Sequence, residues 1–157
     1  MVTEQEKTLI LTLRDLMADL YALYFQAHAA HWNVEGPFFG PLHDFFGHLY
    51  EDVFASIDLV AEGIRFHHAY APISLGKLLE NKSVEDLAVK NGNAQDLLRS
   101  LATANELVGI SVRRAFRAAN DAKDDGLANK LQDQMFVHDK YAWQLRSHLK
   151  NFDTPLA

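Results

Sequence analysis

Apolar residues recur at steps of three or four positions along most of this chain, the spacing that places side chains on one face of an α-helix. Thr3 and Glu6 have the spacing of a capping box, in which each side chain bonds to the other residue's backbone, and they predict the start of a first helix. The apolar stripe of this helix runs to about His31 and comprises Leu9, Leu13, Leu16, Leu20, Leu23 and Ala27.

The sequence NVEGPFFGP interrupts this pattern, because Gly36-Pro37 and Gly40-Pro41 favour turns. Proline is favoured in the first turn of a helix, so a second helix is predicted to begin near Pro41 and to end near His67. The apolar stripe of this second helix comprises Phe46, Leu49, Val53, Ile57, Val60 and Ile64.

Residues 69–93 are predicted to form a long connection between the second and third helices. Within it Ser83 and Asp86 again have capping-box spacing, which predicts a short helix there. Asn93 is a suitable cap for a third helix, the sequence DAKDDG ends that helix, and a fourth helix is expected from about Leu127. The main core-facing positions of these two helices are Leu97, Leu101, Val108 and Ala115, then Leu131, His138, Ala142, Leu145 and Leu149.

Four long amphipathic helices with one long middle connection predict an all-α fold. We expect a four-helix bundle with a crossover between helices two and three and a short helix within that crossover. The length of 157 residues and the hydrophobic content of 48% fit one domain over residues 1–157.

The amino-acid composition limits which metal ligands, cellular location and binding partners we expect. The chain has no cysteine, which excludes disulfides and thiolate metal ligands and suits a reducing cytoplasm, where we expect the protein. Its N-terminus lacks the pattern of a signal peptide, and no apolar run approaches the roughly 20 residues that span a bilayer, so we expect no membrane partner. A formal net charge of −6 disfavours phosphate-rich partners and is compatible with cation binding.

The second helix carries acids and imidazoles on a face that is separate from its apolar stripe. Asp58 and Glu62 are four residues apart, so a helix places both within reach of one cation. At about 100° per residue, His43, Gly47 and Glu51 fall in the same broad sector. Imidazole and carboxylate together suit iron, manganese or zinc.

The reach of these side chains decides how they can meet. His43 and Asp58 are separated by roughly 22 Å along a straight helix, whereas ligands lie about 2 Å from their metal, so one copy of the second helix cannot bring both to one ion. Two copies related by a two-fold axis can, because His43 of one then faces Asp58 or Glu62 of the other, which gives two identical sites per dimer. His31 can join His43 of its own chain.

Simpler interpretations stay open. An Asp-x3-Glu pair on a helix is commonly a solvated face, and His31 or His43 taken singly is more often a hydrogen-bonded surface or interface residue than a ligand. His138 lies on the apolar stripe of the fourth helix, which favours a hydrogen-bonded core or interface histidine.

The segment HWNVEGPFFGPLHDFFGHLYEDVFASIDLVAEGI resembles the Dps family, the miniferritins of the ferritin-like superfamily. The resemblance is carried by His-Trp-Asn-Val, the Gly-Pro turn, a histidine twelve residues after the first and the Asp-x3-Glu pair. HDKYAWQLRSHL in the last helix is also similar. The resemblance implies a ferritin-like four-helix subunit, twelve of which form a hollow homo-dodecamer built from two-fold dimers.

The resemblance also implies a ferroxidase centre at each dimer interface. Such a centre oxidises Fe(II), usually with hydrogen peroxide and otherwise with oxygen, and the shell stores the ferric mineral and protects against oxidative stress. His31 and His43 of one subunit and Asp58 and Glu62 of its mate would hold two iron ions and are the implied catalytic and metal-binding residues. Glu62 would bridge the two metal positions, and Trp32 would pack beside them.

The sequence departs from the family pattern at Gly47, where the family commonly has an aspartate. The second metal position thereby loses a carboxylate, for which His28, His48, Glu51 or a histidine near residue 67 are candidate replacements. A site richer in imidazole favours zinc, as a competitor, or a weaker second iron. A metal-storage shell with weak ferroxidase activity is therefore the alternative function.

Some family members bind DNA through a lysine-rich terminal extension. Here MVTEQEK and NFDTPLA are not basic, and twelve chains at −6 would carry roughly −70, so we expect no DNA binding and keep a chromatin-compacting role as a third hypothesis. Asp121, Asp124 and Asp125 lie where the family places acidic three-fold pores, and solvated loop acids are the other interpretation.

Overall fold

The computed structural model describes residues 1–150 and 152, so most of the C-terminal NFDTPLA segment lies outside the described residues. Within them the structure is helical, apart from a single bridge between Glu35 and Asn93, and the expected all-α four-helix bundle is confirmed. None of the helices in this described part combines the length and the apolar character needed to cross a membrane. The helices are α1 (Glu4–Asn33), α2 (Phe39–Phe66), α3 (Leu75–Leu79), α4 (Ala94–Asp121) and α5 (Asp125–Leu149).

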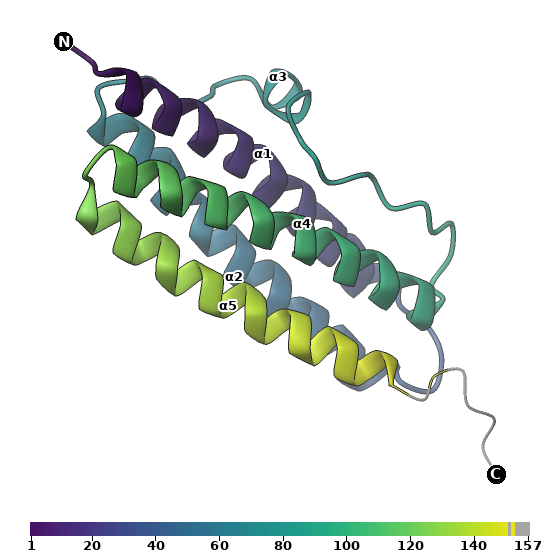
Figure 1. Ribbon diagram of the computed structural model, residues 1–157. Helices are drawn as coiled ribbons and strands as arrows, with labels where there is room; N and C mark the ends of the chain where they lie inside the picture. The colour runs from purple at the N-terminus through teal and green to yellow at the C-terminus, as the bar shows by residue number, and fades with distance from the viewer. Residues whose placement is uncertain (151, 153–157) are drawn as a thin grey trace.

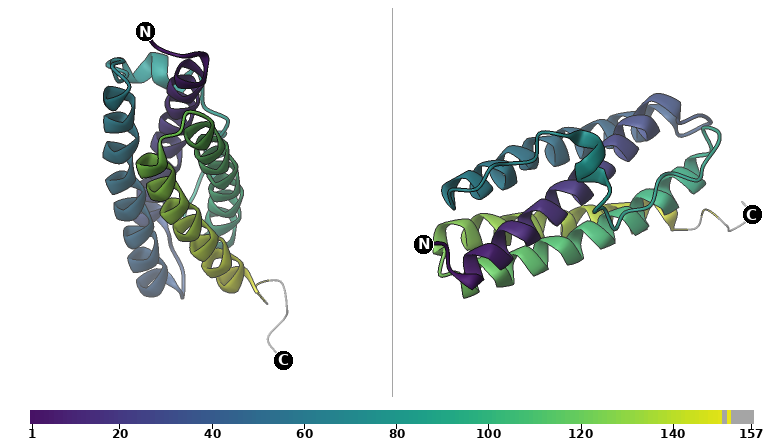
Figure 2. Two further views of the ribbon diagram at one scale, coloured as in Figure 1. Left: turned by 60° about the vertical axis from the view of Figure 1, so that its left-hand side comes forward. Right: turned by 90° about the horizontal axis from the view of Figure 1, so that it is seen from above.

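The four long helices lie side by side, and helices that pack on one another run in opposite directions. In Figure 1, α1 and α5 run away from the end that holds the N-terminus, and α2 and α4 run back toward it. The α1 helix packs on α2 and α4, and α5 packs on α4. Because α2 and α4 are parallel, the chain between them must return along the bundle, and Figure 2 shows this crossover, with α3 in it, on the outside beside α1.

Side-chain caps set where the long helices begin. Thr3 Oγ1 accepts the Glu6 N–H at 3.1 Å and the Glu6 carboxylate accepts the Thr3 N–H at 2.7 Å, so the predicted capping box is present. Asn93 caps α4 as expected, through its side-chain oxygen. Asp124 caps α5 in the same way, and this helix therefore begins slightly before the expected start near Leu127.

The short helix of the crossover lies at Leu75–Leu79, so the position predicted from Ser83 and Asp86 was wrong. Ser74 caps this helix, its Oγ accepting a backbone N–H of the first turn at 3.4 Å. Ser83 instead donates its N–H and its hydroxyl to the carboxylate of Asp19, at 2.6 and 2.7 Å. A tertiary contact with the bundle thus replaces the local capping interaction.

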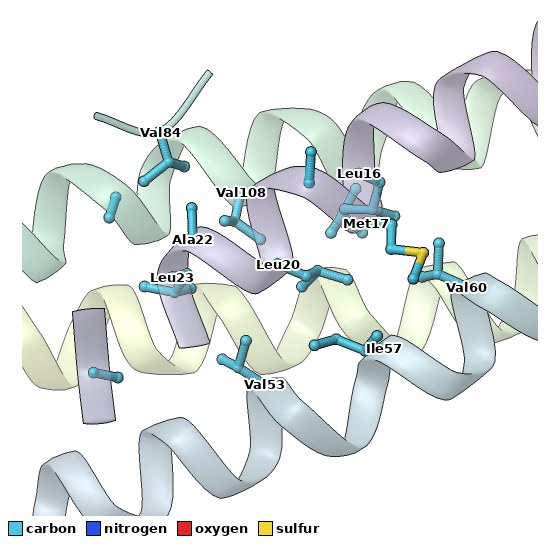
Figure 3. Close-up of a cluster of buried hydrophobic side chains, with 14 of the residues drawn as sticks. Leu16, Met17, Leu20, Ala22, Leu23, Val53, Ile57, Val60, Val84 and Val108 are labelled. Atoms are coloured by element: carbon cyan, nitrogen blue, oxygen red, sulfur yellow. The ribbon is translucent and has the colours of Figure 1, made fainter. Parts of the chain in front are cut away.

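The core is a continuous apolar cluster enclosed by the four long helices and covered on one side by the crossover. The predicted apolar stripes all face it, and only Ala142 and Leu149 near the end of α5 are half-buried. Figure 3 shows a part of this core, with labelled side chains from α1, α2, α4 and the crossover: Leu16, Met17, Leu20, Ala22, Leu23, Val53, Ile57, Val60, Val84 and Val108.

A buried carboxylate joins the crossover to the bundle. Asp19 is only 2% exposed, and besides the two bonds from Ser83 it accepts the Val84 N–H at 3.2 Å and the Ser111 hydroxyl at 2.5 Å. Four donors offset the cost of removing this charge from water. Because these donors belong to the crossover and to α4, one side chain of α1 holds three parts of the chain together.

Replacing Asp19 by asparagine should therefore destabilise the fold. The amide brings N–H donors to a place already filled by donors, and we expect the variant to lose about 2–4 kcal/mol of unfolding free energy. Asp15→Asn is the matched control, because Asp15 lies one turn earlier on α1 and is half-buried, and it should cost less than about 1 kcal/mol. Urea unfolding measured by circular dichroism compares them, and equal losses would contradict the prediction.

A second buried polar pair links α4 and α5. The His138 ring donates from Nδ1 to the Asn105 side-chain oxygen at 2.8 Å, and the Asn105 amide donates to the His138 carbonyl at 2.9 Å. His138 is 2% exposed, so the interpretation as a hydrogen-bonded core histidine is confirmed. Burial lowers the pKa of His138 to about 4, while the nearby Asp139 charge acts in the opposite direction.

The fold should consequently lose stability in acid through His138. Its pKa is about 4 in the fold against 6.5 ordinarily, so its contribution is complete above pH 6.5 and is lost as the pH falls toward 4. This difference corresponds to roughly 3 kcal/mol. We expect His138→Gln, whose amide can still donate to Asn105, to reduce the fall in unfolding free energy over this pH range; an unchanged pH profile would refute the assignment.

Candidate metal centre

The turn between α1 and α2 brings the two predicted imidazole ligands into direct contact. His31 lies in the last turn of α1 and His43 near the start of α2, and both are half-buried. Their rings are stacked, with centroids 3.7 Å apart and an interplanar angle of 19°. The prediction that His31 joins His43 of its own chain is thus met in geometry, whereas their role as metal ligands stays a prediction.

Each ring of this pair is oriented by the backbone of the other residue. His31 donates from Nδ1 to the carbonyl of His43 at 2.6 Å, and His43 donates from Nδ1 to the carbonyl of His31 at 2.7 Å. A carbonyl only accepts, so Nδ1 carries the hydrogen in both rings. In the neutral rings both Nε2 atoms keep their lone pairs, and a carbonyl partner of this kind is the usual support of a metal-binding histidine.

The two predicted carboxylate ligands do not reach this pair within one chain. Asp58 and Glu62 are exposed on α2, about four helical turns or more beyond His43. Among the described residues no group of three or more histidine, aspartate or glutamate side chains is close enough to hold a metal ion. Within one chain the imidazole pair and the carboxylate pair are therefore apart, as the two-fold hypothesis assumes, and their meeting in one site stays a prediction.

An aromatic cluster surrounds the imidazole pair, and sequence reasoning missed its central member, Tyr50. The His28 ring stacks on Tyr50, with centroids 4.0 Å apart and an interplanar angle of 18°. The Trp32 ring also contacts His28, with centroids 4.0 Å apart and an interplanar angle of 36°. Tyr50 also meets the His31 ring edge-on at 5.3 Å. Its position seven residues after His43, close to the same helix sector, was the signal that could have identified it.

His28 is one candidate replacement for the missing carboxylate, and one of its two ring nitrogens already has a hydrogen-bond partner. Its Nδ1 lies 3.2 Å from the Tyr24 hydroxyl, and its ring centroid lies 6.2 Å from that of His31. Burial, followed by the charge of His31, lowers the pKa of His28, so this ring is held neutral more strongly than an ordinary histidine. The neutral form is the one that can coordinate a metal, but the contact of Nδ1 with Tyr24 leaves Nε2 as the ring atom available for that role.

The remaining candidates are placed differently. His48 and Glu51 are exposed on α2. His67 caps the far end of α2, where its Nε2 lies 2.9 Å from the Asp124 carboxylate and its Nδ1 3.5 Å from Glu6. His67 therefore has partners of its own, at the opposite end of the bundle from His31 within this subunit. Asp124 both caps α5 and contacts His67.

A polar contact on another face of α2 involves one of its remaining acids. The Tyr141 hydroxyl of α5 donates to the Asp52 carboxylate. Burial, reinforced by this hydrogen bond and by the charges of Asp52 and Glu51, raises the pKa of Tyr141 well above its usual range. The phenol therefore stays protonated and fixes Asp52 against α5.

Comparisons with known proteins agree with this architecture. The model of the ferritin-like domain matches residues 10–154. The DNA protection during starvation protein 2 of Bacillus anthracis is 27% identical, and the match covers 91% of this chain and 97% of that protein. The crystal structure of a Dps protein from Bacillus brevis has a TM-score of 0.88 at 27% identity and covers 96% of this chain and 100% of that chain.

A third similar protein shows the same fold at lower identity. It is a Dps protein from Vibrio cholerae, described as a member of a broad superfamily of ferritin-like diiron-carboxylate proteins, with a TM-score of 0.88 at 24% identity over 96% of this chain and 98% of that chain. The chain therefore belongs to the ferritin-like family. Within that family, the expected resemblance to the Dps miniferritins is confirmed by these Dps-named relatives.

Mixed oligomers test whether the site is shared between subunits. Oligomers of His31→Ala alone, or of Asp58→Ala alone, should each lose high-affinity metal binding, because every site lacks a ligand. When the two variants are mixed equally, about a quarter of the intersubunit sites should receive both native residues and regain binding. Zinc titration by calorimetry counts these sites, and an absence of recovery after confirmed subunit mixing would contradict the shared site.

Proposed function

We propose that this protein is a ferroxidase and iron-storage miniferritin of the cytoplasm, whose centre is formed by His31 and His43 of one subunit and Asp58 and Glu62 of its two-fold mate. The observation that carries the proposal is the reciprocal bonding of His31 and His43, which leaves an Nε2 lone pair on each ring of a stacked pair. Two pre-oriented imidazoles are half of a ligand set for Fe(II), the substrate.

The proposed second half comes from another copy of the chain. Large apolar side chains are exposed on α1, α2 and the turn between them, and several of them contact the imidazole pair or the aromatic rings around it. Exposed apolar side chains that gather in a patch are typical of a protein interface. Covering this patch with the same face of a two-fold mate would bury these rings and supply the missing carboxylates. The exposed aromatic side chains are Phe25, Trp32, Phe38, Phe39 and Phe54.

The chemistry requires two ferrous ions close together. Each Fe(II) gives up one electron, and one hydrogen peroxide molecule accepts both, so that its O–O bond breaks and two protons complete two water molecules. Because both electrons arrive together, no hydroxyl radical is released. Glu62 would neutralise charge on both ions as a bridge, and the imidazoles would hold them in position. Oxygen is the other oxidant that the proposal allows.

Twelve subunits assembled from such dimers would enclose the ferric product in a homo-dodecameric shell. This assembly is proposed by extension from the Dps family, which the chain resembles over nearly its whole length. The described end of the chain at residues 1–7 carries two glutamates and one lysine, so binding to DNA through this segment is not part of the proposal.

A zinc-occupied storage shell with weak ferroxidase activity is the second candidate. It is favoured by Gly47, which offers no carboxylate beside the imidazole pair, because an imidazole-rich site suits zinc better than iron. Competition separates the two candidates. Equal iron occupancy of both positions under excess zinc favours the ferroxidase, whereas displacement of iron by zinc favours the storage shell.

Stopped-flow oxidation of Fe(II) by hydrogen peroxide tests the main proposal. The native oligomer should oxidise Fe(II) faster than buffer and consume about two Fe(II) per peroxide without spin-trapped hydroxyl radical, and Glu62→Gln should slow this reaction by about 10- to 100-fold. Glu106→Gln, an exposed change on α4, is the matched control and should keep the native rate. Rates equal to buffer for the native protein would overturn the ferroxidase and leave the storage shell.

A further inference from the structure

Gly47 lies directly against the His31 ring. We propose that Gly47 is a positioning residue. Because it has no side chain, it leaves space for the His31 ring to bond to the carbonyl of His43, and this contact, called the Gly47 seat below, sets the metal affinity of the imidazole pair. The inference rests on the proposed metal centre and goes beyond it. It assigns Gly47 a role of its own, instead of treating the position as a ligand that was lost.

Helix geometry explains why residue 47 controls this contact. In an α-helix the carbonyl of residue 43 accepts the N–H of residue 47, four positions later, so the side chain of residue 47 starts beside that carbonyl. His31 uses the same carbonyl as the acceptor for its Nδ1 at 2.6 Å. A Cβ atom at Gly47 would lie 3.3 Å from Nδ1 and 3.4 Å from Cε1 of His31. The contact with Nδ1 is tighter than ordinary van der Waals contact and the one with Cε1 is at its lower limit, so the ring would have to shift by a few tenths of an ångström.

The His31 ring has little freedom to make that movement without loss. One face stacks on His43 at 3.7 Å and its edge meets Tyr50 at 5.3 Å. The His43 ring is in turn bonded to the carbonyl of His31 at 2.7 Å. A displacement of His31 by a few tenths of an ångström therefore lengthens its own hydrogen bond and disturbs the stacked partner, so the positions of both Nε2 atoms change.

This seat makes a prediction that differs from simple loss of a carboxylate. If Gly47 only lacks a ligand, an alanine there changes nothing, because alanine neither adds nor removes a metal donor. If Gly47 seats His31, the single added methyl group weakens metal binding. Gly63→Ala is the matched control, since Gly63 is also buried in α2 and its Cβ would also come within 3.3 Å of a neighbour, the apolar Cδ1 of Leu127.

The experiment compares the native oligomer with Gly47→Ala and Gly63→Ala. Zinc titration by calorimetry measures affinity, and solid-state ¹⁵N spectra of histidine-labelled, metal-free protein measure which ring nitrogen is protonated. Gly47→Ala should weaken zinc binding by about tenfold or more and change the Nδ1 signal of His31, assigned with a His31→Gln sample. Gly63→Ala should change neither. Both variants should fold, because alanine is favoured over glycine within a helix.

The two measurements separate failure of this inference from failure of the proposed function. If Gly47→Ala binds zinc with native affinity, or if Gly63→Ala loses as much affinity as Gly47→Ala, the proposed role of Gly47 is wrong. Neither result contradicts the proposed metal centre. If the native oligomer binds no zinc and no Fe(II), the proposed function fails, and with it the claim that Gly47 sets a metal affinity. In that case the ¹⁵N spectra still show whether Gly47 holds the His31 ring on the carbonyl.

Discussion

The two hydrogen bonds that His31 and His43 donate to each other's backbone carbonyls are the constraint on which the candidate centre depends. They join the last turn of α1 to the beginning of α2, so the path of the intervening turn and the orientation of both rings are fixed together. Since the acceptors are backbone atoms of regular helices, the rings are held without help from flexible side chains. The tautomer that leaves Nε2 for a metal follows directly from this bonding.

The periodic apolar pattern was sufficient to predict the four long helices, because each buries one stripe and its first turn is capped by nearby residues. The capping box of Thr3 and the cap at Asn93 are local interactions that a sequence pattern contains in full. The contact of His31 with His43 could also be anticipated, since a short turn between antiparallel helices returns the chain to the same level of the bundle. These predictions succeed where the determining partners lie in the same turn or are joined by one short turn, as His31 and His43 are across 12 positions.

Other features depend on partners that are distant in the sequence, and there the pattern failed. Ser83 had the spacing of a helix cap, yet its donors are used by Asp19, and the short helix formed at Ser74 instead. Tyr50 resembled an ordinary position on an amphipathic helix, and only the packing of α1 on α2 places it between His28 and His31. The spacing of Tyr50 from His43 indicates its helix face, but no rule based on local spacing contains the tertiary contacts that decide both outcomes.

The network around Asp19 also determines how the chain can reach and leave its native state. Its donors lie 64, 65 and 92 positions further along the sequence, so none of the bonds can form from local structure. Contacts of such long range form only after large loops have closed, which makes them late and slow events in folding. Separating α1 from α4 breaks the bond from Ser111, so the carboxylate that holds the crossover on α1 then keeps only its donors from Ser83 and Val84.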